Sequence, residues 1–237
     1  MRRLLLAALV ALAACETPPA APAMPPVLAQ ACVLPDRIAA PEMETVRPDQ
    51  VVADRPILFH MLAVTWMPET CRAGGDGDGD LACEEQRLGW TLHGLWPNSN
   101  GKPYPRYCRP ATRVAEATIR AELCRTPSVD LVQHEWAAHG TCAWETPEAY
   151  FRQSSALYDG LVRPDPRGLA TAGQLRDAFA RANPGLPRAA VYVALSDEGR
   201  LREARLCHDL AFKPRACPGG DVGAGDGARM TVEPIRP

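Results

Sequence analysis

The hydrophobic pattern of the chain predicts short strands and helices in irregular alternation. Apolar, β-leaning residues favour a buried strand over 57–66 and a second strand over 89–96 that ends in a turn at Pro97-Asn98. A hairpin is expected near the carboxyl end. It would pair 190–195 with 200–207 across the turn at 197–199.

Four further segments are typical of helices: 111–124, 130–138, a stretch that begins at Thr146, and 171–183. Thr146 is a capping residue, and Pro147 follows it at the first helical position. Pro184-Gly185 would end the last of these helices. Helices mixed with locally paired strands indicate an α+β fold rather than a wound parallel sheet.

The amino terminus resembles an export signal. Met1-Arg2-Arg3 is positively charged, and the apolar run 4–14 behind it is too short to span a bilayer but suits a signal peptide. The run ends in Leu12-Ala13-Ala14-Cys15, which is similar to a bacterial lipoprotein cleavage box. We therefore expect residues 1–14 to be removed and Cys15 to carry lipid. An ordinary signal peptide that is cut nearby is the alternative.

This signal divides the chain into three parts. A signal peptide covers 1–14, a Pro/Ala-rich extended tether covers 15–31, and one folded domain covers 32–237. The expected location is the periplasm or the outer membrane as a lipoprotein, or alternatively the medium as a secreted protein. The membrane would be contacted only through lipid at Cys15.

Charge excludes one class of function. The chain carries a net charge of −2, and loss of Arg2 and Arg3 with the signal would make it −4. Proteins that hold nucleic acid by bulk electrostatics are usually basic, because they neutralise phosphates. A nucleic-acid partner of this chain would be captured locally and released, which suits an enzyme better than a stoichiometric binder.

The chain has nine cysteines. With Cys15 used for lipid, eight remain, and an even number in an exported protein predicts four disulfides. A metal site would require closely spaced cysteines such as a Cys-x-x-Cys pair, and the sequence contains none. Short loops favour the pairs Cys71–Cys83 and Cys207–Cys217, and the partners of the other four cysteines stay open.

Three of the five histidines lie in two short segments, Trp90-Thr-Leu-His-Gly-Leu-Trp-Pro97 and His134-Glu-Trp-Ala-Ala-His-Gly-Thr-Cys142. In a helix, Glu135 and His139 are four residues apart and share a face. His134 and His139 are five apart, so they do not form the His-Glu-x-x-His pattern of zinc proteases. We therefore expect neither a metal nor another cofactor.

Two histidines without a metal suit acid–base chemistry at a phosphodiester, because imidazole titrates near neutrality. RNA supplies its own nucleophile, the 2′-hydroxyl. One imidazole would remove that proton, and the other would protonate the departing 5′-oxygen, which leaves a 2′,3′-cyclic phosphate. A nearby carboxylate could orient one imidazole and raise its pKa.

Both segments resemble the two active-site segments of the ribonuclease T2 family, and weaker similarity extends over 32–237. The resemblance implies an α+β fold with a central antiparallel sheet, flanking helices and stabilising disulfides. It also implies a monomeric, metal-independent endoribonuclease that cleaves single-stranded RNA with low sequence specificity. The product would be a 2′,3′-cyclic phosphate and then a 3′-phosphate. The alternative is a catalytically impaired relative that binds RNA.

The resemblance also implies residue roles. His93 matches the general acid, His139 the general base, His134 the phosphate-holding histidine, and Glu135 the acidic residue that assists the charged transition state. Trp96, Asn98 and Tyr104 fall where the family contacts a base, and Cys108–Cys142 matches its core disulfide.

Three positions depart from the family pattern. Many members carry Lys where this chain has Ala138, and losing such a donor costs on the order of 10²-fold in rate unless an arginine replaces it. An acidic residue that some members carry is Asn98 here, and the usual Gln before Trp66 is Thr65. Base preference therefore stays open.

The remaining candidates are expected to be structural. His60 lies within an apolar strand, which favours a core histidine, and His208 follows Cys207 in a disulfide loop. The acidic loop Asp76-Asp78-Asp80 lacks the glycine and glutamate of a calcium-binding EF-hand loop. A solvated loop is the expectation there.

Overall fold

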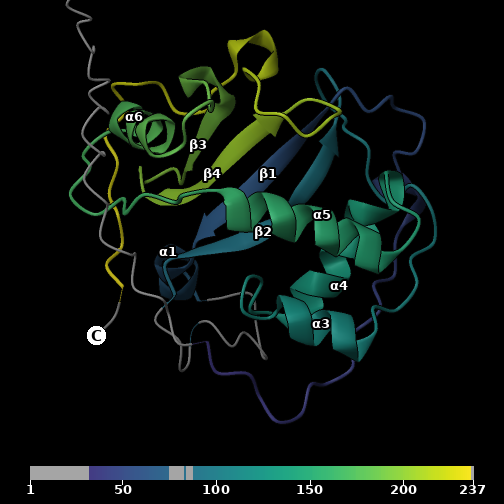
Figure 1. The fold of residues 1–237 in the computed structure, drawn as a ribbon. Helices are drawn as coiled ribbons and strands as arrows, with labels where there is room; N and C mark the ends of the chain where they lie inside the picture. Colours follow the sequence, from purple (N-terminus) through teal and green to yellow (C-terminus); the bar gives the residue numbers. More distant parts are fainter. Residues whose placement is uncertain (1–31, 75–82, 84–87, 236–237) are drawn as a thin grey trace, which may run out of the picture.

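A four-stranded antiparallel sheet forms the centre of the computed structural model (Figure 1). The structure describes residues 32–74, 83 and 88–235. The expected signal, the lipid site Cys15, the tether and the acidic loop lie outside these residues. The strands, in the spatial order β2-β1-β4-β3, are β1 Phe59–Trp66, β2 Trp90–Asn98, β3 Val191–Leu195 and β4 Leu201–His208. The expected α+β fold and the β3–β4 hairpin are confirmed.

Alternation along the strands decides which side chains enter the core. Val64 on β1 is aligned with Ala204 on β4, and both are fully buried in the main hydrophobic cluster. Their neighbours Thr65 and Glu203 are also aligned and point to the other side of the sheet. The pairing register therefore places a carboxylate beside a hydroxyl on the side away from the main core.

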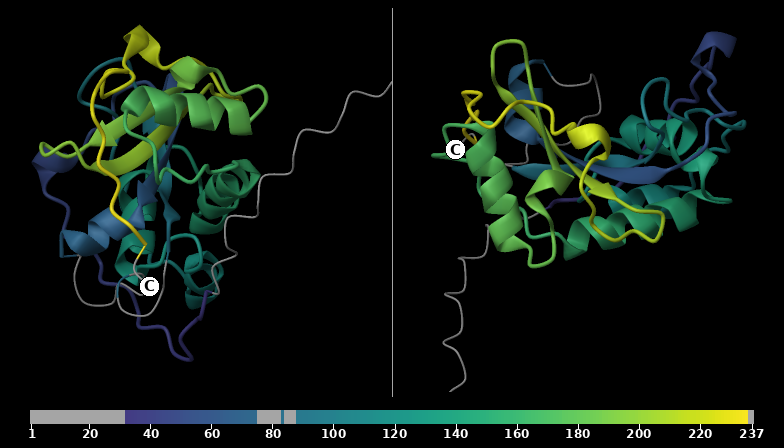
Figure 2. Two further views of the ribbon diagram at one scale, coloured as in Figure 1. Left: turned by 90° about the vertical axis from the view of Figure 1, so that its left-hand side faces the viewer. Right: turned by 90° about the horizontal axis from the view of Figure 1, so that it is seen from above.

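The helices are α1 Met67–Arg72, α3 Glu116–Glu122, α4 Val129–Ala138, α5 Pro147–Gly160 and α6 Ala172–Ala182, with 3-10 turns at Pro48–Gln50, Gly140–Cys142, Arg188–Ala190 and Pro218–Gly220. Helices α5 and α6 lie on one face of the sheet (Figure 2). Their aromatic residues Tyr150, Phe151 and Phe179 are buried against it. No helix within the described ranges is both long and apolar enough to cross a membrane.

The start of α5 agrees with its predicted capping signal, and α6 begins with a cap of the same kind. The Thr146 hydroxyl accepts a hydrogen bond from the Ala149 N–H, and Thr171 does the same for Gln174. Each bond satisfies one of the backbone donors that the first turn of a helix leaves free. The predicted starts of both helices are confirmed.

Two predicted boundaries are wrong. The helix expected over 111–124 begins only at Glu116, because the Gln133 side chain bonds the Val114 N–H and the Thr112 carbonyl and holds that stretch extended. The turn expected at Pro97-Asn98 is instead the end of β2. Strand β2 is an edge strand, where a proline can lack its N–H without losing a ladder bond.

Four disulfides join the described cysteines. Cys71–Cys83 and Cys207–Cys217 confirm the pairs that short loops favoured, and Cys108–Cys142 confirms the pair that the resemblance implied. The remaining bridge, Cys32–Cys124, ties the amino-terminal segment to the chain just after α3. Each bridge reduces the conformational freedom of the unfolded chain.

Candidate active site

His93 stands at an irregularity of the sheet. On β1, Ala63 is aligned with Gly94 of β2, and the next residue, Val64, is aligned with Leu92. His93 is therefore the extra residue of a β-bulge. A bulge bends its strand and redirects a side chain, and bulges are frequent next to active sites. Here the bulge lets Leu92 and Leu95 both enter the core.

The His93 imidazole lies between two carboxylates. Its Nδ1 atom is 2.6 Å from Oε1 of Glu203, and its Nε2 atom is 3.3 Å from Oε1 of Glu135. Burial disfavours the charged ring, but hydrogen bonds and charges from Glu135 and Glu203 outweigh it and raise the pKa of His93 to about 10. His93 is therefore held in its protonated form.

Glu135 is fully buried at the centre of the cluster, on α4. Its Oε2 atom accepts hydrogen bonds from Nε1 of Trp96 at 2.9 Å and from the Tyr150 hydroxyl at 3.4 Å. Burial raises the pKa of this carboxyl, but the coulombic interaction with the His139 ring and the hydrogen bond and charge of His93 outweigh that effect and lower it. Glu135 thus stays ionised without contact to solvent.

His139 lies where α4 ends. Its φ of −122° departs from helical geometry, and its N–H still bonds the Glu135 carbonyl. The imidazole stacks on Trp96, with ring centroids 5.3 Å apart and planes inclined by 30°, and on Tyr104 at 6.3 Å and 27°. Burial outweighs the attraction of Glu135 and lowers the pKa of His139 to about 4. This histidine is neutral where His93 is charged.

His134 lies at the rim of the cluster and is half-buried. Its ring centroid is 6.5 Å from that of His139, and the two planes are nearly perpendicular. Nδ1 of His134 contacts Oε1 of Glu44 at 2.5 Å, and the Tyr107 hydroxyl donates to the other oxygen of Glu44. Glu44 was not anticipated, because it lies 90 residues earlier in a segment without regular structure.

A backbone bond and a disulfide hold the end of α4. The Tyr107 N–H donates to the carbonyl of Ala138 at 2.9 Å. Next to these two residues, Cys108–Cys142 bridges the segment before α3 to the turn after His139. Together they fix the backbone on both sides of that imidazole.

The structure brings His93, Glu135, His139, Trp96 and Tyr104 into one cluster, with His134 at its edge. Asn98 is half-buried on β2 two residues after Trp96, so both side chains project from the same side of that strand. His60 and His208, the two histidines expected to be structural, are both buried, as core histidines would be. His60 packs against the rings of Trp144 and Phe212.

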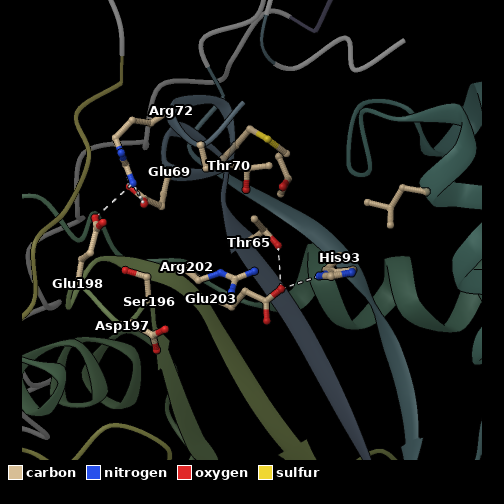
Figure 3. Close-up of a pocket in the computed structure, with 14 residues that line it drawn as sticks. Thr65, Glu69, Thr70, Arg72, His93, Ser196, Asp197, Glu198, Arg202 and Glu203 are labelled. Carbon is tan, nitrogen blue, oxygen red and sulfur yellow. Dashed lines mark hydrogen bonds and ion pairs between the residues drawn. The ribbon is translucent and has the colours of Figure 1, made fainter. Parts of the chain in front are cut away.

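Two site residues on β4 were missed. Glu203 contacts His93 as described above, and the guanidinium of Arg205 lies 4.9 Å from the Trp96 ring centroid while it pairs with Glu203. A cavity of about 570 Å³ opens beside Glu203 and His93 (Figure 3). The alternation of β4 indicated that these charged side chains avoid the core, but only the strand pairing shows what they face.

The described residues contain no group of three or more His, Cys, Asp or Glu side chains arranged to hold a metal ion. The titratable and charged groups of the site are imidazoles, carboxylates and the guanidinium of Arg205. These groups can donate and accept protons around a negatively charged substrate.

Comparison with known proteins concerns the sequence and the fold. Residues 57–164 match the family model of ribonuclease T2. The chain is 29% identical to a probable ribonuclease of Haemophilus influenzae over 178 residues, which cover 70% of this chain and 62% of that protein. It is 34% identical to a ribonuclease of Aeromonas hydrophila over 114 residues, which cover 48% of this chain and 50% of that protein. The matched part of the chain thus spans between one half and somewhat under two thirds of the length of these relatives.

Among solved structures, an RNase-related protein from Calystegia sepium has a TM-score of 0.60 at 18% identity, over 77% of this chain and 100% of that one. At this identity the likeness concerns the fold. Over 57–164, somewhat under half of the chain, the sequence is similar to the ribonuclease T2 family, and the related sequences and the fold agree with that similarity.

Proposed function

We propose that this protein is an endoribonuclease that cleaves single-stranded RNA with low sequence specificity and without a metal. The observation that carries the proposal is the placement of two histidines, His93 and His139, beside Trp96 and around the buried carboxylate of Glu135. The pKa of His93 is raised to about 10, and that of His139 is lowered to about 4. Two titratable groups pushed apart in this way suit an acid and a base.

In the first step, neutral His139 accepts the proton of the 2′-hydroxyl, and the 2′-oxygen attacks phosphorus. The bond from phosphorus to the 5′-oxygen breaks, and protonated His93 gives its proton to that leaving oxygen. The product is a 2′,3′-cyclic phosphate and a free 5′-hydroxyl. In the second step, the roles reverse: His93 takes a proton from water as the water oxygen attacks phosphorus. The bond from phosphorus to the 2′-oxygen breaks, and His139 protonates that oxygen. A 3′-phosphate results.

The other site residues have supporting roles in this proposal. His134, at the open rim, holds a phosphate oxygen. Glu135 stabilises the imidazolium that forms during each step, because its ionised carboxylate contacts His93 and its charge acts on His139. Trp96, Asn98 and Tyr104 contact a base, as in the family pattern. Two arginines bring positive charge to the site: Arg205 lies beside Trp96, and the charge of Arg106 acts on His139.

Export and a monomeric state belong to the same proposal. Eight paired cysteines suit an oxidising compartment such as the periplasm or the medium. The lipid at Cys15 would be the only attachment to a membrane. Mass spectrometry of the mature amino terminus tests this part, and an unmodified terminus at a residue other than Cys15 would rule out the anchor.

The decisive experiment is end-group analysis of the products. Purified, oxidised protein is incubated in EDTA with a single-stranded RNA and, separately, with DNA of the same sequence. We expect a transient 2′,3′-cyclic phosphate that converts to a 3′-phosphate, and intact DNA, which lacks the 2′-hydroxyl. Loss of cleavage on chelation, or 5′-phosphate ends, would refute the mechanism. Binding of RNA without cleavage would identify a catalytically impaired relative.

A further inference from the structure

We infer that Glu203 is a positioning residue, which holds the His93 ring by its Nδ1 atom so that the opposite nitrogen, Nε2, delivers the proton to the leaving group. This inference rests on the proposed function, since it assigns a partner to the proposed general acid. It adds to the active site a carboxylate that lies 110 residues from His93 in the sequence.

The contact between the two side chains is short and is supported from several directions. Oε1 of Glu203 lies 2.6 Å from Nδ1 of His93, and the Thr65 hydroxyl donates to the same oxygen at 3.3 Å (Figure 3). The other oxygen, Oε2, accepts a hydrogen bond from Nε of Arg205 at 2.7 Å. Because three elements of the sheet thus fix one carboxylate, its orientation towards His93 is predetermined.

Burial strengthens the interaction. The Glu203 side chain is only 9% exposed, although it carries a charge. Its own pKa is depressed to about 2: burial opposes ionisation, but the hydrogen bond and charge of His93 and the pairing with Arg205 outweigh it. Glu203 is therefore an anion at every pH at which an enzyme of this kind works.

This geometry decides which nitrogen of His93 is reactive. An imidazole whose Nδ1–H is donated to a carboxylate is fixed in ring orientation and in tautomer, so Nε2 is the atom that gains and loses a proton. Nε2 faces Glu135 across 3.3 Å, inside the cluster that contains Trp96 and His139. Glu203 thus holds the ring from outside the reaction centre while Nε2 points into it.

The charged groups around His93 come from two other elements. Helix α4 presents Glu135, and His139 follows at its end. Strand β4 presents Glu203 and its partner Arg205. Glu135 and Glu203 both favour the protonated ring, while the positive charge of Arg205 is paired to Glu203. Removing the Glu203 charge should therefore leave one carboxylate at His93 and make its proton easier to lose.

The test compares Glu203→Gln with Glu198→Gln, its matched control. Glu198 belongs to the turn of the same hairpin, is 76% exposed and pairs weakly with Arg72 at 3.8 Å. Both variants, Glu203→Asp and the unmodified protein are measured for kcat/KM against pH on a short RNA. The pKa of His93 is followed by NMR, with its signal assigned through loss in His93→Asn. Thermal melts check that each variant is folded.

We expect Glu203→Gln to lower the pKa of His93 by roughly one to three units and to move the alkaline limb of the pH profile by the same amount. Glu203→Asp should restore part of the shift, and Glu198→Gln should behave like the unmodified protein. A folded Glu203→Gln protein with an unshifted His93 titration, or with activity lowered equally at all pH values, would overturn the inference. Absence of RNA cleavage by the unmodified protein would instead refute the proposed function. The two failures are distinguishable, because the NMR titration of His93 does not depend on turnover.

Discussion

Gly94 and Glu135 approach each other so closely that a Cβ atom at position 94 would lie 1.8 Å from Oε2 of the carboxylate and 3.0 Å from the Tyr150 hydroxyl. Only glycine leaves this space free, so the strand and helix α4 can pack with a carboxylate between them. The residue beside His93 therefore determines where the buried charge of the site can lie.

Replacing Gly94 by alanine should displace Glu135 from both His93 and Trp96. We expect kcat/KM on RNA to fall by about 10²-fold, because small displacements of site groups have effects of that size. The free energy of unfolding should fall by about 1–3 kcal/mol through overpacking. Steady-state kinetics and urea unfolding measure the two effects. The control is Gly160→Ala, since a Cβ there meets nothing within 4 Å; a fully active Gly94→Ala protein would contradict the placement of Glu135.

Removing either imidazole should slow RNA cleavage strongly without loss of the fold. Acid–base groups contribute about 10²- to 10⁴-fold each, so His93→Ala and His139→Ala should lose rate of that order. Circular dichroism and a thermal melt check the structure of each variant. A fully active His139→Ala protein would exclude this histidine as the general base.

The pH dependence of kcat/KM should form a broad bell. His139 must be neutral to accept a proton, and its lowered pKa of about 4 sets the acidic limb. His93 must be protonated to donate one, and its raised pKa of about 10 sets the alkaline limb. Activity should thus be retained between these values, fall below about 4 and fall above about 10. Initial rates across a buffer series check this, and a narrow optimum near pH 6.5 would disagree with the described site.

Loss of the Cys108–Cys142 disulfide should affect both stability and rate. The bridge closes a loop across 34 residues next to His139, so replacing both cysteines by serine should cost about 2–5 kcal/mol of unfolding free energy. The rate should fall as well, because the turn after α4 loses its anchor. The same double replacement at Cys71–Cys83, whose bridge lies beside α1, serves as the control. Equal catalytic rates in the two double variants would show that the bridge does not position His139.

The sequence by itself determined the local features of this protein. The Thr146-Pro147 cap predicted the start of α5, and an apolar, β-leaning run predicted β1. Two segments around a turn predicted the β3–β4 hairpin, and short loops predicted two disulfides. The two histidine segments indicated the family before any geometry was known. Each of these signals involves residues that are close together in the sequence. It can therefore be recognised without the three-dimensional structure.

Only the tertiary structure decided what surrounds the histidines. Three features depend on which distant segments of the chain contact each other. They are the bulge at His93, the alignment of Thr65 with Glu203, and the contact of Gln133 that shortens α3. The opposite pKa shifts of His93 and His139 likewise come from burial and from carboxylates, one of which lies far along the chain. Desolvation and charge act through space, so folding creates them, and no local pattern of residues encodes them.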